Sequence, residues 1–217
     1  WFVEEFQNEE VGLVVKTNLA KNCLMDRERL YSDLQGFLNN FTDRKCKVYL
    51  LHGDMTDEEI HSLYKHPQIK ALLALPHGEG FGLPIFEAAY MGLPVVATGW
   101  SGQLDFLCDE DKKEHFYNVS FDIQPVQDAV VWEGVIVKES MWAYPREQSA
   151  KEQMRMCYNN IVNNVDGSHA ENACKYANEL YDRFDAEKMH AQFCDNVYKI
   201  NQEEEEWLEA LSEIELV

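Results

Sequence analysis

Positive charge is scarce in this sequence: 19 lysines and arginines stand against 39 aspartates and glutamates in 217 residues. Proteins that bind nucleic acid draw much of their affinity from Lys and Arg placed beside phosphates. The formal net charge of −20 therefore argues against nucleic acid as the main partner. A small phosphorylated ligand is still compatible with this charge, because salt screens charges beyond about 8 Å and local donors then decide.

Long apolar runs are also absent, and none approaches the roughly 20 residues that a membrane-spanning helix needs. The first ten residues, WFVEEFQNEE, are acidic where a signal peptide would be basic and then apolar. We therefore expect no transmembrane segment and no export signal. The first residue is Trp1 rather than methionine, and we expect the chain to be part of something longer.

The six cysteines contain no C-x-x-C pair, which fits neither a zinc site nor a disulfide framework. We expect reduced, mostly buried thiols in a cytoplasmic protein. The residues His52, His61, His66 and Asp54 do not have the spacing of metal ligands, so we predict no metal site.

Short apolar segments alternate with longer helical patterns, which predicts an α/β fold with a doubly wound parallel sheet. The expected strands are VGLVV from Val11, KVYLL from Lys47, ALLAL from Ala71 and PVVAT from Pro94. The first three are almost continuously apolar, so we expect both of their faces to be buried. We divide the chain into a Rossmann-like lobe of residues 1–160 and C-terminal helices in residues 161–217.

Capping residues predict where the helices begin. The expected starts are marked by Asp26, by a capping box of Thr56 and Glu59, by Pro145 in a first turn, by a second box of Ser168 and Glu171, and by Asp185. The stretch 100–144 is irregular, with short strands expected in YNVSFDIQPV and EGVIV. Near the C-terminus Trp207, Leu211 and Ile214 share one helical face, which predicts that this helix docks on the body.

The segment HGEGFGLPIFEAAYMGLPVVAT, residues 77–98, carries the main functional signal. Three glycines allow the chain to turn from a strand into a helix, and Pro84 suits the first helical turn. The free N–H groups from Phe81 to Ile85 then face the carboxyl edge of the sheet, where open α/β sheets bind ligands. A helix start of this kind binds anions, so the turn is suited to a diphosphate.

Two carboxylates, Glu79 and Glu87, flank this anion site. A carboxylate would repel a phosphate, but it accepts hydrogen bonds from hydroxyl groups. We therefore expect one glutamate beside a sugar ring and the other beside a ribose, with the diphosphate between them. The alternative is a flexible strand-to-helix loop with both glutamates solvated.

The segment EGFGLPIFEAAYMGLPVVATGWSG resembles the donor-binding signature of retaining GT-B glycosyltransferases of group 1. The shared pattern is Glu, seven residues and a second Glu, followed by Gly-x-Pro-Val-Val-Ala-Thr and a Ser-Gly turn. Weaker similarity extends over residues 11–160. The resemblance implies the donor-binding domain of an enzyme that transfers a sugar from a nucleoside-diphosphate sugar to an unknown acceptor. It also implies that no metal or other cofactor is needed.

The resemblance assigns roles to individual positions. Glu79 matches the glutamate beside the transferred sugar, which makes it the catalytic candidate, and Glu87 matches the glutamate that holds the ribose. The backbone that contacts sugar and diphosphate corresponds to Gly80, Phe81, Gly82 and Leu83. Gly53 matches the position at which the family's main chain runs around the nucleotide base. Lys16 is a candidate for the cation that neutralises the diphosphate, and an ordinary solvated lysine is its alternative.

The sequence departs from the family in two respects. The strand and loop that normally supply an Arg and a Lys to the diphosphate are not found, and neither is the acceptor-binding domain that precedes this one. We keep two alternatives: a non-catalytic nucleotide-sugar binding module and a nucleotide-sugar epimerase lobe. Transfer by a longer chain separates the enzyme from the binding module, whereas release of a free epimer without an acceptor indicates the epimerase.

Overall fold

Parallel strands form the centre of the fold, in two hydrogen-bonded sheets. The computed structural model describes residues 1–19 and 22–212. Strand β1 (Gly12–Thr17) pairs with β2 (Lys47–His52), and β3 (Leu72–Ala74), β4 (Val95–Thr98) and β5 (Tyr117–Val119) pair in the order β3-β4-β5. All four strands expected from the sequence are therefore present, and all of these pairs are parallel.

Helices cover both faces of the three-stranded sheet. On one side, Val96 lies in an apolar cluster with residues of α1 (Phe2–Phe6) and α6 (Glu147–Val162). On the other side, Val95 and Ala97 lie in a cluster with residues of α4 (Leu83–Tyr90), α5 (Leu104–Leu107) and α7 (His169–Arg183). Alternate residues of β4 thus enter opposite layers, and the doubly wound α/β fold is confirmed.

The two sheets share one apolar layer although no strand pairing joins β1 to β3. Val48 of β2 and Leu73 of β3 both pack against the cluster beneath α1 and α6. The expectation that β1, β2 and β3 are buried on both faces is wrong, since none of their residues is fully buried. The reason is that β1 and β3 each have a single neighbouring strand, and α2 (Leu24–Leu38) buries only Leu38.

Three of the five predicted helix starts have the expected capping residue. Helix α3 (Asp57–Tyr64) begins with the complete capping box of Thr56 and Glu59. The hydroxyl of Ser168 accepts a hydrogen bond from the N–H of Glu171 at the start of α7. Asp185 accepts from two backbone N–H groups at the start of α8 (Ala186–Ser212).

The other two helix starts were misplaced by two or three residues. Helix α2 begins at Leu24 after Cys23, so Asp26 lies inside the first turn and is not the N-cap residue. Helix α6 begins at Glu147, because Pro145 is the last residue of strand β7 (Met141–Pro145). Proline has no N–H to donate, and it is tolerated at such an edge position because no ladder hydrogen bond needs that donor there.

The irregular stretch contains a hairpin that the sequence did not fully predict. Strand β6 (Phe121–Pro125) was expected, and it pairs antiparallel with β7, which was not. Between them lie the short 3-10 helix η1 (Asp128–Val130) and an isolated bridge between Trp132 and Ile136. The expected strand at EGVIV is therefore wrong.

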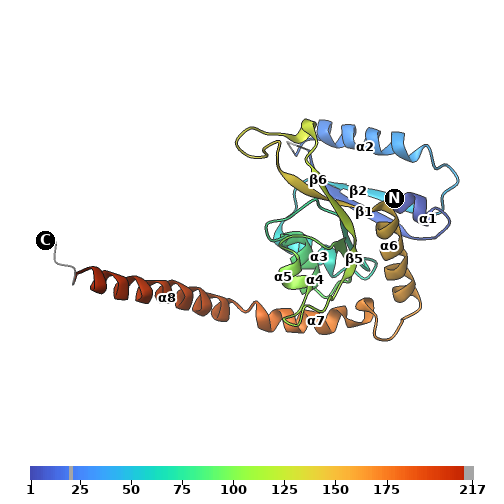
Figure 1. Cartoon of the computed structure of the whole chain (residues 1–217). Coiled ribbons are helices and arrows are strands. Elements are labelled where there is room, and N and C mark those ends of the chain that lie inside the picture. Colours follow the sequence, from blue (N-terminus) through green and yellow to red (C-terminus); the bar gives the residue numbers. More distant parts are fainter. Residues whose placement is uncertain (20–21, 213–217) are drawn as a thin grey trace.

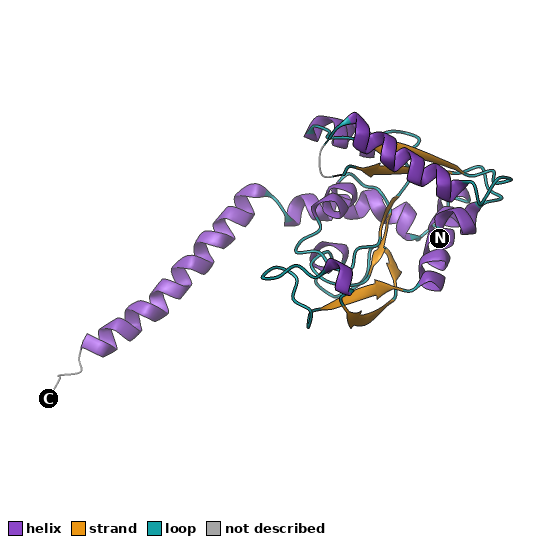
Figure 2. Cartoon of the chain, turned by 90° about the horizontal axis from the view of Figure 1, so that it is seen from above, coloured by secondary structure: helices purple, strands orange, loops and turns teal. Residues whose placement is uncertain are grey.

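Helix α8 extends away from the rest of the molecule, as Figures 1 and 2 show from two directions. Trp207 is 68% exposed, so the expected docking of this helix is wrong for that residue. The side chain of Leu211 and all of Ile214 lie outside the described part. Among the described residues, no helix is long and apolar enough to cross a membrane.

All six cysteines are within the described residues and are unpaired. Only Cys46 and Cys157 are buried, while Cys23, Cys174 and Cys194 are exposed. The expectation of mostly buried thiols is wrong, because three cysteines lie on helices or loops at the surface. Burial raises the pKa of the Cys157 thiol to about 12, so this thiol is inert near neutral pH.

Candidate functional site

The glycine turn joins β3 to α4 as the sequence predicted. Gly82 is the residue before the helix and has a left-handed backbone with φ of +88°, a conformation that favours glycine. Pro84 lies in the first turn, and the N–H groups of Ile85 and Phe86 both donate to the Gly82 carbonyl at 2.9 Å. The helix therefore starts at the predicted place.

Three backbone N–H groups at this helix start remain available. Those of Phe81, Gly82 and Leu83 donate to no residue in the described part of the chain. The ring of Phe81 lies against Phe86 and Phe106, with centroid distances of 5.2 and 5.0 Å. Unpaired N–H groups at a helix N-terminus attract anions through hydrogen bonds and through the helix dipole.

The backbone of Glu79 is clamped by the loop that follows β4. Ser101 Oγ donates to the Glu79 carbonyl at 2.6 Å and accepts from the Glu79 N–H at 3.3 Å. The N–H of Gly102 donates to the same carbonyl at 3.1 Å. This clamp fixes the position from which the half-buried Glu79 side chain extends.

Gly102 must be glycine because the two loops touch there. A Cβ atom at this position would lie 1.9 Å from the Gly80 carbonyl oxygen. Next to it, Gln103 is fully buried and donates to the Thr98 carbonyl at 2.9 Å. The sequence excludes a nucleophile elbow at GWSGQ, since Gln103 replaces the required glycine. The structure shows that this segment instead supports the glycine turn.

Two buried polar atoms beside the turn are unsatisfied. Neither Thr98 Oγ1 nor Gln103 Oε1 has a hydrogen-bond partner in the described residues. A Cβ atom added to Gly82 would lie 3.4 Å from the Gln103 Cβ, so this pair lies directly behind the turn. Sequence reasoning did not assign Thr98 or Gln103 to the site, although both lie inside or beside the matched motif.

Glu87 lies one turn into α4, on the side away from the core. It follows Leu83 by four residues and therefore shares its face, and Leu83 is 58% exposed. Tyr64 of α3 donates to the Pro84 carbonyl at 3.2 Å. The pKa of Tyr64 is raised, first by burial and then by the negative charge of Glu87. Tyr64 is thus a neighbour of Glu87 that the sequence did not reveal.

Lys16 and Gly53 meet at the carboxyl edge of the other sheet. Lys16 Nζ donates to the Gly53 carbonyl at 2.5 Å, and Gly53 has a φ of +112°. Beside them, Asn18 and Asn22 donate to the two carboxylate oxygens of Asp54. These two asparagines were not identified from the sequence. Their signal is only that they follow β1, the strand that contains Lys16.

His77 is held by the unpredicted strand β7. Its ring nitrogen Nδ1 lies 2.8 Å from the Ala143 carbonyl oxygen, and its own carbonyl accepts from the Ala143 N–H at 3.0 Å. The ring also stacks on Trp142 with an interplanar angle of 8°. His77 is therefore a structural residue that fastens the hairpin to the start of the glycine turn.

The predicted site residues form two groups. Glu79, Gly80, Phe81, Gly82, Leu83 and Glu87 lie together between β3 and α4, and Lys16 and Gly53 lie together after β1 and β2. No hydrogen bond or ion pair among the described residues joins the two groups. Nor do three or more His, Cys, Asp or Glu side chains of the described chain converge as metal ligands would.

These features define an α/β protein with three unpaired backbone N–H groups at a helix start that follows a strand of a parallel sheet. Residues 45–125 match the family described as "Glycosyl transferases group 1". The match covers less than half of the chain, and this part is similar to that family. The matched residues include β2 through β6 and hence the whole glycine turn with both glutamates.

The chain is also similar to a solved chain described as "Crystal structure of GtfA/B complex". The identity is 13% and the TM-score is 0.46, over 90% of this chain and 37% of that chain. This protein therefore spans about a third of the length of the chain that it matches. No curated protein shows a significant match to the sequence.

Proposed function

We propose that this lobe binds the nucleoside-diphosphate sugar of a retaining glycosyltransferase. The observation that carries the proposal is the set of three unpaired N–H groups, from Phe81 to Leu83, at the start of α4. A hydrogen bond to a charged group contributes about 1.5–3 kcal/mol, and a helix end adds about 0.3–1 kcal/mol. Two donors and the dipole are enough to hold a diphosphate against the overall negative charge.

In the proposed arrangement the turn stabilises the leaving diphosphate while charge develops on it, as preorganised donors do. Glu79, fixed by Ser101 and Gly102, accepts hydrogen bonds from hydroxyls of the transferred sugar. Glu87 accepts from the ribose. Both glutamates then position the donor, and the acceptor's proton goes to the leaving phosphate. No metal or cofactor takes part in this proposal.

The second group supports the same proposal less directly. Lys16 donates one of its three N–H groups to the Gly53 carbonyl, so further donors remain for a phosphate. Gly53 is buried and has a left-handed φ of +112°, and in this proposal its main chain runs past the nucleotide base. The unpaired cysteines favour a reducing compartment, in keeping with a cytoplasmic enzyme.

Calorimetry with a panel of nucleoside diphosphates and their sugars tests the proposal. We expect weak binding of at least one nucleoside diphosphate. We expect no transfer by this lobe alone, because the resemblance places the acceptor groups in another domain. Absence of heat with every nucleotide, or a strong preference for an unrelated ligand, would contradict the proposal.

A further inference from the structure

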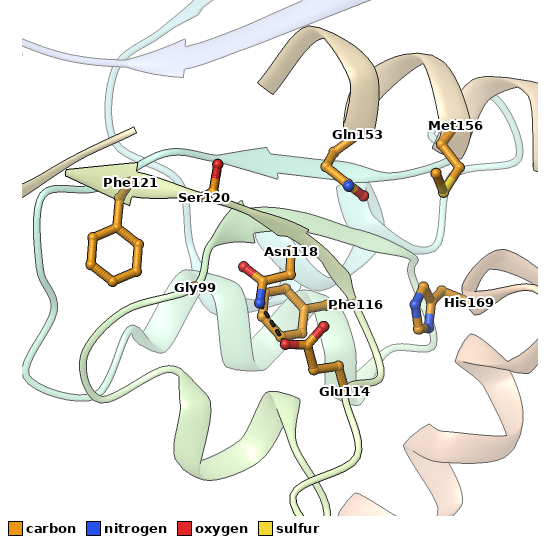
Figure 3. A pocket seen from close by; sticks show the side chains of 9 residues that line it. All are labelled: Gly99, Glu114, Phe116, Asn118, Ser120, Phe121, Gln153, Met156 and His169. Carbon is orange, nitrogen blue, oxygen red and sulfur yellow. Dashed lines mark hydrogen bonds between the residues drawn. The ribbon is translucent and has the colours of Figure 1, made fainter. Parts of the chain in front are cut away.

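A hollow of about 540 Å³ lies along the outer edge of β5. Its lining is drawn in Figure 3 and consists of Gly99, Glu114, Phe116, Asn118, Ser120, Phe121, Gln153, Met156 and His169. We call it the β5 groove. None of these residues belongs to the glycine turn or to α4, and the proposed donor site uses none of them.

The groove has hydrogen-bonding groups on two opposite walls. On the strand side, Asn118 Nδ2 donates to Glu114 Oε1 at 2.5 Å, which leaves the second carboxylate oxygen of Glu114 available. On the helix side, Gln153 extends from α6 toward the same space (Figure 3), and its amide has no hydrogen bond to a described residue. The walls therefore offer both acceptors and donors to one ligand.

Charge in the groove excludes anionic ligands. None of its lining residues in the described part of the chain is a lysine or arginine, and Glu114 contributes a carboxylate. Burial is the main cause that lowers the pKa of His169, and the neighbouring His115 lowers it further. The His169 ring is therefore neutral near neutral pH. A phosphate or a carboxylate would meet repulsion here without a compensating cation.

The free edge of β5 is too short for a peptide strand. The N–H of Gly99 donates to the Val119 carbonyl, so Val119 faces β4 and the main chain of Asn118 faces outward. The main chain of the next residue, Ser120, is not available to a peptide strand. Its N–H donates to Ser149 Oγ, and its carbonyl accepts from the Arg146 N–H. Only residues 116–118 remain open, which is at the lower limit of strand length.

Apolar surface completes the groove. Phe121 lies at one end, with its ring 5.3 Å from that of Trp100. Met156 lies one turn after Gln153 on α6 and is 48% exposed. A sugar ring has hydroxyls at its rim and C–H groups on its faces, so it can use amide and carboxylate walls together with such apolar surface.

We infer that the β5 groove binds a neutral carbohydrate unit, separately from the nucleotide-sugar site. Glu114 and the main chain of Asn118 hold hydroxyls from the strand side, and the Gln153 amide holds them from α6. Phe121 and Met156 contact the face of the ring. The glycan bound here carries no phosphate.

Titration of the ¹⁵N-labelled whole chain tests the inference, with glucose, galactose, N-acetylglucosamine and maltose as probes. We expect saturable shifts in the NMR signals of Asn118, Ser120 and the Gln153 side-chain amide. Gln153→Ala and Glu114→Gln should each weaken binding about two- to tenfold, the effect of one lost hydrogen bond. Asn159→Ala, an exposed amide on the same helix outside the groove, should leave the affinity unchanged.

The outcome does not depend on nucleotide binding. Shifts that appear unchanged in the presence of a saturating nucleoside diphosphate support a separate site, even if the proposed donor function fails. Three results overturn the inference: no probe shifts these signals, the shifts instead cluster on residues 79–87, or neither groove variant lowers the affinity. If ethylammonium shifts the same signals and no sugar does, the groove binds cations, and the inference is overturned.

Discussion

Glycines that look alike in the sequence differ in what surrounds them. Gly80 and Gly36 have nothing within 4 Å of an added Cβ, whereas Gly102 would collide with the Gly80 backbone. Only the last position is fixed by contact between two loops. The glycine turn therefore depends on a residue that lies some twenty positions later in the chain.

Gly102→Ala should destabilise the fold by about 1–3 kcal/mol, the usual cost of overpacking, because the methyl group must displace the Gly80 carbonyl. Urea unfolding measures the change. Gly36→Ala is the control, since this glycine lies in a helix with open space around it and alanine favours helices. Equal stability of the two variants would show that the loops are not in contact.

Glu87→Gln should weaken nucleoside-diphosphate binding by about 1.5–3 kcal/mol, because a charged acceptor of ribose hydroxyls becomes neutral. Calorimetry measures the affinity, and thermal unfolding shows that the fold is unaffected. Glu179→Gln is the matched control, as Glu179 is an exposed carboxylate on α7. The ribose role is rejected if both variants bind like the unchanged protein.

Asp109 should make folding stability sensitive to acid. His115 Nε2 lies 2.9 Å from its carboxylate, and this hydrogen bond is the main reason that the pKa of Asp109 lies below its ordinary value. A lowered pKa in the folded state contributes stability above the ordinary pKa of about 3.9. That stability is lost as the pH falls through the folded-state value.

Asp109→Asn should therefore lower the melting temperature at pH 7 and have a diminishing effect as the pH falls below the ordinary Asp pKa of about 3.9. Thermal unfolding over this range measures the difference between variant and unchanged protein. Glu110→Gln, at an exposed neighbouring position, should show no such dependence on pH. A constant difference at every pH would contradict the role of the carboxylate.

At the scale of elements, a buried tyrosine on α7 hydrogen-bonds to α5, beside the sheet. Tyr176 donates to the Phe106 carbonyl at 2.9 Å and stacks on His115 with ring centroids 3.8 Å apart. Burial raises its pKa to about 12, so the hydroxyl stays protonated as a donor. Phe106 and Phe86 belong to the same cluster, and Phe81 of the glycine turn packs on both, so α7 also supports the glycine turn.

Tyr176→Phe should cost about 1–3 kcal/mol in folding free energy, because the Phe106 carbonyl loses its buried donor. Chemical denaturation followed by circular dichroism measures the loss. Tyr181→Phe, on the same helix with its side chain 42% exposed, should be nearly neutral. Similar effects from both changes would show that the Tyr176 hydroxyl is not an important donor.

The sequence predicted the features that depend on residues close together in the chain. The capping box of Thr56 and Glu59, and the glycine and proline at the start of α4, are short-range signals, and the structure has both. Strand β7 was missed because its pairing with β6 spans an irregular loop that no periodic pattern marks. Burial of β1 and β2 was overestimated because it depends on neighbouring strands and helices, which a single segment does not encode.

The candidate site shows the same difference between features set by neighbouring residues and features set by tertiary contacts. The positions inside the motif, including Glu79 and Glu87, came from contiguous residues. Ser101 and Gly102 acquire their role through contacts across more than twenty residues, and Tyr64 through its hydrogen bond to the start of α4. Such contacts are tertiary, so composition and spacing could not assign them.

At the scale of the whole molecule, α8 contributes little to the folded body. Its residues Met189, Phe193 and Val197 are 39%, 69% and 41% exposed, and no core cluster contains a described residue beyond Phe184. The stability of the body should therefore be independent of most of this helix.

Deletion of residues 190–217 should leave the melting temperature within about 2–4 °C of the full chain, which corresponds to less than about 1 kcal/mol for a protein of this size. Differential scanning calorimetry measures it. Deletion from residue 169 is the contrasting control, because it also removes the buried Tyr176 and Leu180 and should prevent folding. A large loss from the shorter deletion would mean that α8 packs on the body.

The projecting helix also affects how the protein moves through solvent. Its 27 residues, at 1.5 Å each, reach about 40 Å, whereas a globule of the remaining size has a radius of gyration of about 16 Å. A compact body with one projecting helix has a higher frictional coefficient than a sphere of the same mass. Gel-filtration columns calibrated with spherical standards would therefore overstate the mass of a single chain, and light scattering would give the true value.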